Sequence, residues 1–203
     1  MMNYTGPKVR VSRALGVPLT PKAARIMENK SYPPGQHGPN TRRRRRVEGF
    51  KAQLLEKQRL RAQYNVHERQ MKTYFKRALR ARGNTGDVLV ACLETRLDAV
   101  VLRSGFARTI YAARQYVNHG HIQVNGEKVD RPGYTVRPGD VVAVRQESRK
   151  ILCFREALDS GVNPPDYLSV DKDELTSRLE RIPVRDEVPV ICDVQKIIEF
   201  YSR

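Results

Sequence analysis

The sequence contains little cysteine and no tryptophan, and its thiols and imidazoles do not gather into a metal site. The three cysteines among 203 residues are Cys92, Cys153 and Cys192, which are widely spaced and form no C-x-x-C pair. This usage fits reduced thiols in a cytosolic chain. His119 and His121 are close in sequence but have no cysteine or acidic residue beside them, whereas a zinc site needs roughly four converging ligands. We therefore expect no disulfide framework, no metal and no cofactor.

Long apolar runs are also missing. Hydrophobic residues make up 39% of the chain and the mean hydropathy is −0.60, which is enough for one or two small cores. No apolar run approaches the roughly 18 residues that a membrane-spanning helix needs, which argues against an integral membrane protein. The first residues contain no apolar stretch of the kind found in secretory signals and do not suggest a transit peptide. We expect a cytoplasmic protein.

Acidic residues are scarce in the first part of the chain. Residues 1–82 contain 21 lysines and arginines against 4 acidic residues, a net charge of +17, whereas residues 83–203 have a net charge of −1. Solubility alone does not require one sign of charge to be concentrated in one region. Such a concentration indicates a polyanionic partner, of which nucleic acid is the commonest.

Residues 1–47 are expected to form an extended basic arm. Prolines and glycines recur through this segment and interrupt regular helices and strands. The segment ends in five consecutive arginines, Arg42 to Arg46. These arginines could form a solvated loop, but the surrounding positive charge favours a patch that binds phosphates.

Residues 48–94, completed by residues 151–203, are expected to form a helical body. Apolar residues repeat at helical spacing from Met71 to Leu79, and we interpret this stripe as core. The opposite face of the same helix is the candidate nucleic-acid surface. It carries Arg69, Lys72, Lys76, Arg77 and Arg80. The apolar terminal residues 195–201 are expected to return to the helices.

Residues 95–150 predict a small separate module. A Thr-x-x-Asp signal at Thr95 and a threonine at Thr109 can each begin a helix. The Asn125-Gly126 pair is a strong hairpin signal, and the apolar residues 141–144 predict a buried strand. The fold class is thus α+β. It combines a helical body and an extended arm with a module of two helices packed on a small, twisted, mainly antiparallel sheet.

Candidate RNA-binding side chains occur on the arm, on the basic helices and around the second helix of the module. Each one alone could be an ordinary surface residue, but their clustering suits the phosphates and contours of a folded RNA. The candidates are Lys8, Arg10, Arg13, Arg42, Arg43, Arg44, Arg45, Arg46, Lys51, Lys57, Arg59, Arg61, Arg69, Lys72, Lys76, Arg108, Arg114, Gln115, Asn118, His119, His121 and Lys128.

Five strings at matching spacing resemble the bacterial family of small-subunit ribosomal protein 4. The resemblance covers nearly the whole chain, and residues 95–150 are similar to the small RNA-binding domain named after that family. Members of one form of the family carry a zinc-binding cysteine cluster in the arm. This chain has no cysteine between Met1 and Tyr32, so it resembles the zinc-free form. The strings are YPPGQHG at 32–38, EKQ at 56–58, LETRLD at 93–98, ARQYVNHGHIQVNG at 113–126 and IEFYSR at 198–203.

The resemblance implies a constituent of the small (30S) ribosomal subunit. Such a protein binds 16S rRNA directly, at a junction of helices in the 5′ domain, and nucleates assembly of the 30S body. The resemblance also implies contact with small-subunit ribosomal protein 5, a role with proteins 5 and 12 in translational accuracy, and a place near the channel through which mRNA enters. Some members also bind their own mRNA.

Two other functions compete with this one. An RNA-modifying enzyme is disfavoured because the chain has no G-x-G-x-x-G loop, no P-loop and no recognisable Cys/His nucleophile pair, so we expect no enzymatic activity. A free RNA chaperone or stress-response RNA-binding protein would share the charge and the module, and it stays open as the alternative. It gives no reason for the PPGQHG and EFYSR strings.

Overall fold

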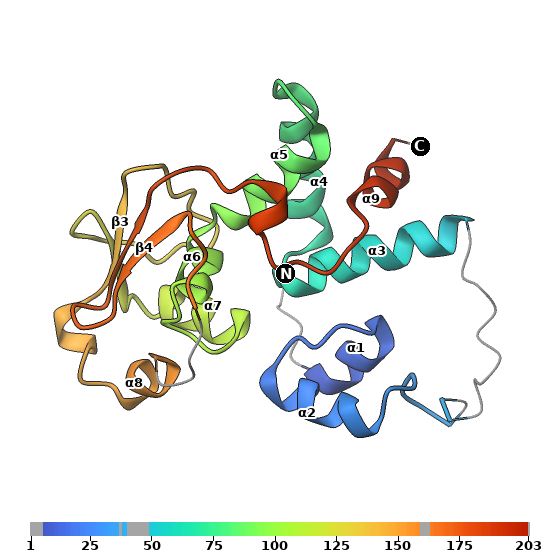
Figure 1. Ribbon diagram of the computed structural model, residues 1–203, viewed down its shortest axis with the longest axis horizontal. Helices are drawn as coiled ribbons and strands as arrows, with labels where there is room; N and C mark the ends of the chain where they lie inside the picture. Colours follow the sequence, from blue (N-terminus) through green and yellow to red (C-terminus); the bar gives the residue numbers. More distant parts are fainter. Residues whose placement is uncertain (1–5, 37, 40–48, 159–162, 203) are drawn as a thin grey trace. The chain divides into compact units, whose positions relative to one another are not determined.

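The computed structural model describes residues 6–36, 38–39, 49–158 and 163–202 of the chain (Figure 1). The chain forms two compact units: residues 1–80 with 190–203, here called the helical unit, and residues 81–189, here called the sheet unit. The helical unit contains α1 (Lys8–Leu15), α2 (Pro21–Asn29), α3 (Gly49–Gln63), α4 (Glu68–Arg80) and α9 (Val194–Tyr201).

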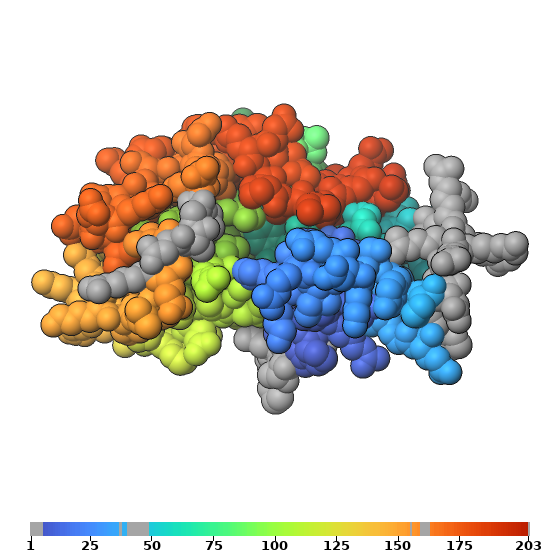
Figure 2. Space-filling model, turned by 60° about the horizontal axis from the view of Figure 1, so that its bottom comes forward, coloured from blue at the N-terminus to red at the C-terminus, as the bar shows by residue number. Residues whose placement is uncertain are grey.

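Two regular helices occupy much of the segment expected to be extended. The prolines counted as breakers lie outside these helices or in a first turn, where a missing N–H costs nothing. Gly16 ends α1 in the left-handed conformation with φ 70°, and the Thr20 hydroxyl accepts a hydrogen bond from the Ala23 N–H at the start of α2. The structure thus differs from the expected arm, because local capping outweighs the proline content. The helices α1 and α2 lie side by side and form part of the surface (blue in Figure 2).

The core of the helical unit lies between α3, α4 and α9. Most of the apolar face of α4 is buried, as its spacing predicts, and includes Met71 and Phe75. Leu79, at the end of the stripe expected to be core, is 55% exposed, because it lies in the last turn of the helix. The C-terminal helix α9 packs along α3. The Tyr201 ring lies 4.9 Å from that of Phe75 between centroids, and Ile197 is fully buried. The terminal segment therefore returns to the helices.

The sheet unit confirms the α+β fold class. Its sheet has the strand order β2-β1-β3-β5-β4, and every neighbouring pair is antiparallel. The elements are α5 (Thr85–Glu94), α6 (Leu97–Arg103), α7 (Ile110–Asn118), β1 (Ile122–Val124), β2 (Glu127–Lys128), β3 (Val141–Val144), the 3-10 helix η1 (Gln146–Ser148), α8 (Leu152–Leu158), β4 (Leu168–Asp171), β5 (Thr176–Leu179) and the 3-10 helix η2 (Arg185–Glu187).

The strands β4 and β5 differ from the expected role of residues 151–203. They extend the sheet of the sheet unit rather than the helical body, because β5 pairs along β3 with Val142 opposite Ser177. Leu168 and Leu179 add their side chains to the core of the same unit. The strands β3 and β5 are far apart in the sequence. The residues of β5 alone do not show which strand of the sheet they will pair with.

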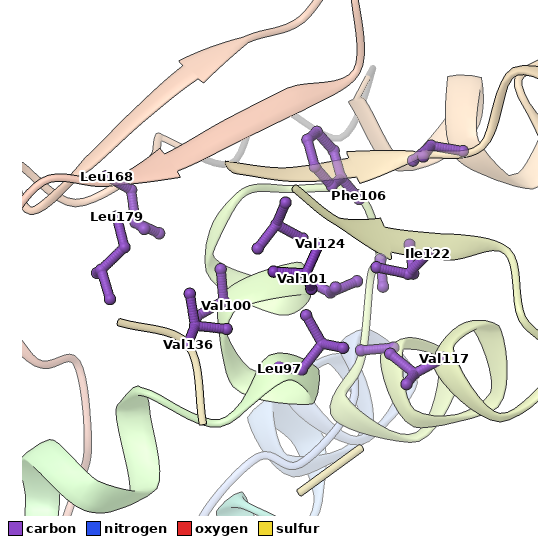
Figure 3. Packing of buried hydrophobic residues seen from close by; sticks show 14 of the residues in the cluster. Leu97, Val100, Val101, Phe106, Val117, Ile122, Val124, Val136, Leu168 and Leu179 are labelled. Carbon is purple, nitrogen blue, oxygen red and sulfur yellow. The ribbon is translucent and has the colours of Figure 1, made fainter. Parts of the chain in front are cut away.

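The core of the sheet unit lies between the sheet and the helices α6 and α7 (Figure 3). Side chains of the helices, such as Leu97 and Val117, meet those of the strands, such as Ile122 and Val124. Alternation along β1 buries Ile122 and Val124 and leaves Gln123 between them on the other face. The helices thus cover one face of a small sheet.

Two local signals are confirmed in this unit and one is corrected. Asn125 and Gly126 both have positive φ, 51° and 86°, as a two-residue hairpin turn requires. The Thr109 hydroxyl caps α7 by accepting from the Ala112 N–H. The expected Thr95-to-Asp98 cap is absent, because Arg96 is the residue before α6 and the Asp98 carboxylate binds the Arg96 guanidinium instead.

None of the described helices is both long and apolar enough to cross a membrane.

Candidate nucleic-acid interface

One cationic stripe runs along the exposed face of α4. Its members are three or four residues apart, so they project from the same side of the helix. All are exposed, and none forms an ion pair with another described residue. We call Arg69, Lys72, Lys76 and Arg80 the α4 stripe. Like charges at this spacing destabilise an isolated helix, and an anion bound along the stripe would remove that repulsion.

The apolar side of α4 positions the stripe. Met71, Tyr74 and Phe75 are buried in the helical unit, which fixes the rotation of the helix about its axis. Arg77, between the two faces, lies with its guanidinium carbon 5.9 Å from the centre of the Tyr74 ring. The stripe is therefore presented by a packed element and needs no ordering of its backbone.

The cations of α3 are largely used within the protein. Lys57 is buried, with its Nζ 2.9 Å from Glu68 Oε2 and 4.5 Å from the centre of the Phe200 ring. Arg59 donates to the Leu15 carbonyl at 2.8 Å and to Glu56 at 2.6 Å. Of the four α3 candidates, Lys51 alone is exposed without a described ion-pair partner.

Glu68 joins three helices of the helical unit. Besides Lys57, its carboxylate accepts from the Tyr201 hydroxyl at 2.9 Å and lies 3.5 Å from Arg61 Nη1. Burial alone would raise the pKa of Glu68, but the hydrogen bonds from Lys57 and Tyr201 outweigh burial and lower it. Lys57 and Arg61 therefore stabilise the packing of α3, α4 and α9.

Two of the three α1 candidates, Arg13 and Lys8, are partly buried, and the third, Arg10, is exposed. The Arg13 guanidinium donates to the carbonyls of Tyr32 and Pro33 and lies 4.8 Å from the centre of the Tyr32 ring, so it ties the PPG turn to α1. Lys8 is half-buried, and burial lowers its pKa. Arg10 is exposed and has no described ion-pair partner. The arginines Arg42 to Arg46 lie outside the described residues.

A second polar cluster lies at the end of α7 in the sheet unit. Gln115, Asn118 and His119 are exposed on the last turn. Lys128 reaches this turn from β2, since a Cβ built on Gly120 would lie 2.2 Å from the Lys128 Cε. Glycine at position 120 therefore allows the lysine to cross the turn. We call Gln115, Asn118, His119 and Lys128 the α7 cluster; Arg108 is exposed just before α7.

Two other candidates of α7 and its turn face inward. Arg114 keeps 13% of its side chain exposed and lies 3.6 Å from the buried Asp98 carboxylate, which Arg96 also binds. The His121 Nδ1 lies 2.9 Å from the Ser148 hydroxyl. Burial lowers the pKa of His121, and the positive charges of His119 and Arg145 add to the effect. A neutral His121 at neutral pH contributes no positive charge toward a phosphate, and the Arg114 guanidinium is directed at Asp98.

No group of three or more metal-ligating side chains occurs within the described ranges. The arrangement that the structure does contain is two sets of solvent-facing donors, one on each unit, each held by a packed helix. Such sets can bind phosphates and base edges without carrying out a reaction.

Comparison with known families shows which family the chain belongs to. Residues 3–94 match the family profile described as "Ribosomal protein S4/S9 N-terminal domain", and residues 95–142 match the profile described as "S4 domain". Fold and profiles together define a ribosomal protein with an S4-type RNA-binding domain. Over its full length, the chain is 54% identical to small ribosomal subunit protein uS4 of Streptomyces avermitilis across 207 aligned residues, covering 100% of both chains.

Two further relatives carry the same name. The chain is 53% identical to small ribosomal subunit protein uS4 of Streptomyces coelicolor and 47% identical to that of Thermobifida fusca, again with both chains fully covered. The chain belongs to the uS4 family of small ribosomal subunit proteins. This is a family of ribosomal structural proteins and not of enzymes.

Proposed function

We propose that this protein is a constituent of the small ribosomal subunit that binds 16S rRNA at a helical junction of the 5′ domain and nucleates assembly of the 30S body. The observation that carries this proposal is the presence of unpaired cationic and polar donors on both units, the α4 stripe and the α7 cluster. The names of the full-length relatives support the ribosomal location. The protein thus acts in the cytoplasm, by binding.

Two contact surfaces on one chain explain how such a protein can select a single RNA arrangement. Phosphate contacts alone would bind many RNAs, with an affinity that falls steeply as salt rises. A junction that reaches both surfaces gains from the high effective concentration of the second surface once the first is bound. Binding then stabilises this arrangement of the RNA junction relative to its other conformations. Such stabilisation is sufficient to nucleate assembly.

Further roles belong to the same proposal. We infer contact with small-subunit ribosomal protein 5, a contribution with proteins 5 and 12 to translational accuracy, and contact with mRNA near the channel where it enters. The arginine-rich segment 42–46 binds phosphates of mRNA or of rRNA. Residues 95–150 serve as a separate RNA-binding module of the protein. The support for these roles is the family resemblance together with the concentration of positive charge in residues 1–82.

The test is binding of the purified protein to a 16S 5′-domain transcript across a salt series. A transcript with the junction disrupted and a tRNA serve as matched RNA controls. We expect tight binding to the intact junction alone, surviving moderate salt. Equal binding to all three RNAs, lost together as salt rises, would overturn the proposal and leave a general polycation. Release from 30S particles at moderate salt would favour the free RNA chaperone.

A further inference from the structure

An exposed aromatic side chain stands between two unpaired arginines on the loop that precedes β3. Tyr134 is 39% exposed, and no other aromatic residue described in the sheet unit is as accessible. Its ring makes no hydrogen bond or ring contact with another described residue. Arg131 and Arg137 are exposed on either side, and neither guanidinium pairs with a described acid. None of these three belongs to the α4 stripe or the α7 cluster.

The backbone of this loop is fixed although its side chains face solvent. The Tyr134 carbonyl accepts from the Leu97 N–H at 2.8 Å, and the Pro132 carbonyl accepts from the Asp98 N–H at 3.2 Å. The Val136 N–H donates to the Thr95 carbonyl at 2.8 Å. The loop thereby satisfies N–H groups in the first turn of α6, which otherwise lack partners within the helix.

A buried side chain and a tight turn complete the anchoring. Val136 is 1% exposed and lies beside Val100 in the core (Figure 3). The Tyr134 N–H donates to the Arg131 carbonyl at 2.9 Å, which brings these two residues to the ends of one turn. A ring held on such a backbone loses little conformational freedom when a ligand covers it.

The acidic residues of the loop do not neutralise its arginines. The Asp140 carboxylate accepts from the Arg137 main-chain N–H and from the Asn125 side-chain amide, both at 2.8 Å. Asp130 is exposed next to Arg131 and is the remaining negative charge of the loop. The guanidinium groups therefore stay available to an anion from solvent.

An exposed tyrosine flanked by arginines matches the chemistry of an unpaired nucleotide. Aromatic rings and guanidinium planes stack on splayed-out bases, and arginine also binds the adjoining phosphates. A single exposed apolar residue is by itself ordinary on a protein surface. The combination with two unpaired guanidinium groups on a fixed backbone favours RNA over a protein partner, for which a larger apolar patch would be expected.

We propose that Tyr134, with Arg131 and Arg137, is a stacking platform for an unpaired RNA base, separate from the α4 stripe and the α7 cluster. This inference rests on the proposed function, since the base belongs to an rRNA that the other surfaces also hold. Tyr134 supplies the stacking face, and the two arginines bind phosphates on either side of the base.

The absence of tryptophan allows a direct test in the full-length protein. Tyr134→Trp introduces a single indole, whose fluorescence is quenched when a base stacks on it. Val184→Trp, at a site that is 57% exposed in the same unit, is the matched control. On titration with the 5′-domain transcript we expect quenching at position 134 and none at 184.

Affinity measurements separate stacking from other roles of the ring. Tyr134→Ala should weaken binding to the transcript about tenfold, whereas Tyr134→Phe should stay within about twofold of the original protein, because only the alanine variant loses the ring. Circular dichroism establishes that each variant is folded. Arg131→Gln should lower the slope of log K against log salt by roughly one.

The outcomes distinguish this platform from the proposed function. Tight, junction-specific binding without quenching at 134, and with Tyr134→Ala unchanged, would overturn the platform and leave the proposed function intact. Intact RNA binding by Tyr134→Ala with weaker incorporation beside other ribosomal proteins would assign the ring to a protein contact and also overturn it. Failure of the original protein to select the junction would overturn the proposed function itself.

Discussion

The helices α3 and α4 are neighbours in the sequence and are both rich in lysine and arginine, but they use this charge in opposite ways. Three of the four cations of α3, Lys57, Arg59 and Arg61, contact Glu56, Glu68 or a main-chain carbonyl, and Lys57 is buried. Those of the α4 stripe are exposed, and none forms an ion pair with an acid in the part of the chain that the structure describes. Positive charge is therefore available to a partner only where the fold supplies no internal acceptor, which is why we propose the α4 stripe, and not the α3 cations, as a nucleic-acid surface. A count of basic residues does not distinguish the two helices.

The largest expected effect is on RNA affinity, from removing charge on α4. The triple variant Arg69→Gln, Lys72→Gln and Lys76→Gln should bind the 5′-domain transcript about 100-fold more weakly, because three charge-assisted contacts at roughly 1 kcal/mol each are lost. The salt slope should fall by about 2 to 3. The stability of the protein should not decrease, since no described internal pair is broken.

A matched triple variant in α2 and at its C-cap residue tests whether the position of the positive charge affects RNA affinity or only its amount. Lys22→Gln, Arg25→Gln and Lys30→Gln remove the same charge from exposed sites of the same unit. A loss of affinity equal to that of the α4 variant would abolish the distinction between the two surfaces and reduce the α4 stripe to general polycation binding.

The next largest effect is on the stability of the protein, from removing the charge of Glu68, which pairs with the α3 cations Lys57 and Arg61. Glu68→Gln should lower the free energy of unfolding by about 2 kcal/mol, because Lys57 then stays buried without a counter-charge. Urea unfolding followed by circular dichroism measures the change. Glu28→Gln, an equal change at an exposed site of α2, is the control and should be neutral. RNA affinity of the folded Glu68→Gln protein should change little; a large loss would place the α3 cations in the interface.

A smaller effect extends the comparison to α7. Arg114→Gln should cost about 1 kcal/mol of stability, since Asp98 loses one of its two guanidinium partners but keeps Arg96. Gln115→Ala, one residue along the same helix, should leave stability unchanged and weaken RNA binding. If Arg114→Gln left stability untouched and reduced affinity alone, Arg114 would be a direct ligand and the inward role assigned to it would be wrong.

The smallest expected effect is a pH dependence from His121. Its pKa in the folded protein lies below the ordinary value of 6.5, so the unfolded chain takes up a proton first as the pH falls. The contribution of His121 to stability is therefore fully present above pH 6.5 and decreases as the pH drops below that value. Urea midpoints between pH 7.5 and about 5.5 measure it. The variant His121→Gln should flatten this dependence, and an unchanged pH profile in that variant would contradict the assignment.

Features of the fold that depend on neighbours in sequence were predictable. The Asn125-Gly126 turn, the Thr109 cap and the two faces of α4 follow from local conformational preference and helical spacing. The proline content of residues 1–47 predicts an extended arm, whereas α1 and α2 form because Gly16 and Thr20 cap them. The spacing of Thr95 and Asp98 likewise does not show whether the Asp98 carboxylate caps the helix or binds the nearby Arg96 guanidinium.

The sequence indicates which residue types the candidate interface contains, but not which individual residues are exposed and available to a partner. Lys72 and Gln115 are exposed in the structure, while Lys57 and Arg114 face inward. Their residue types and local spacing give no sign of this difference, because the acids that occupy them lie on other elements. Tyr134 belongs to a loop and is part of no repeating apolar or polar pattern. Only the structure shows that its side chain is exposed while its backbone is held by hydrogen bonds.

By itself, the sequence determined the helix α4, the hairpin, the concentration of positive charge in residues 1–82 and the α+β class, because each arises from local spacing or from composition. Only the tertiary structure decided that β5 pairs with β3, that Glu68 forms an ion pair with Lys57, and that the first turn of α6 donates hydrogen bonds to the loop containing Tyr134. These three outcomes share one physical cause. Each needs a partner on another secondary-structure element, and the contact stabilises the protein only after folding has brought the two elements together.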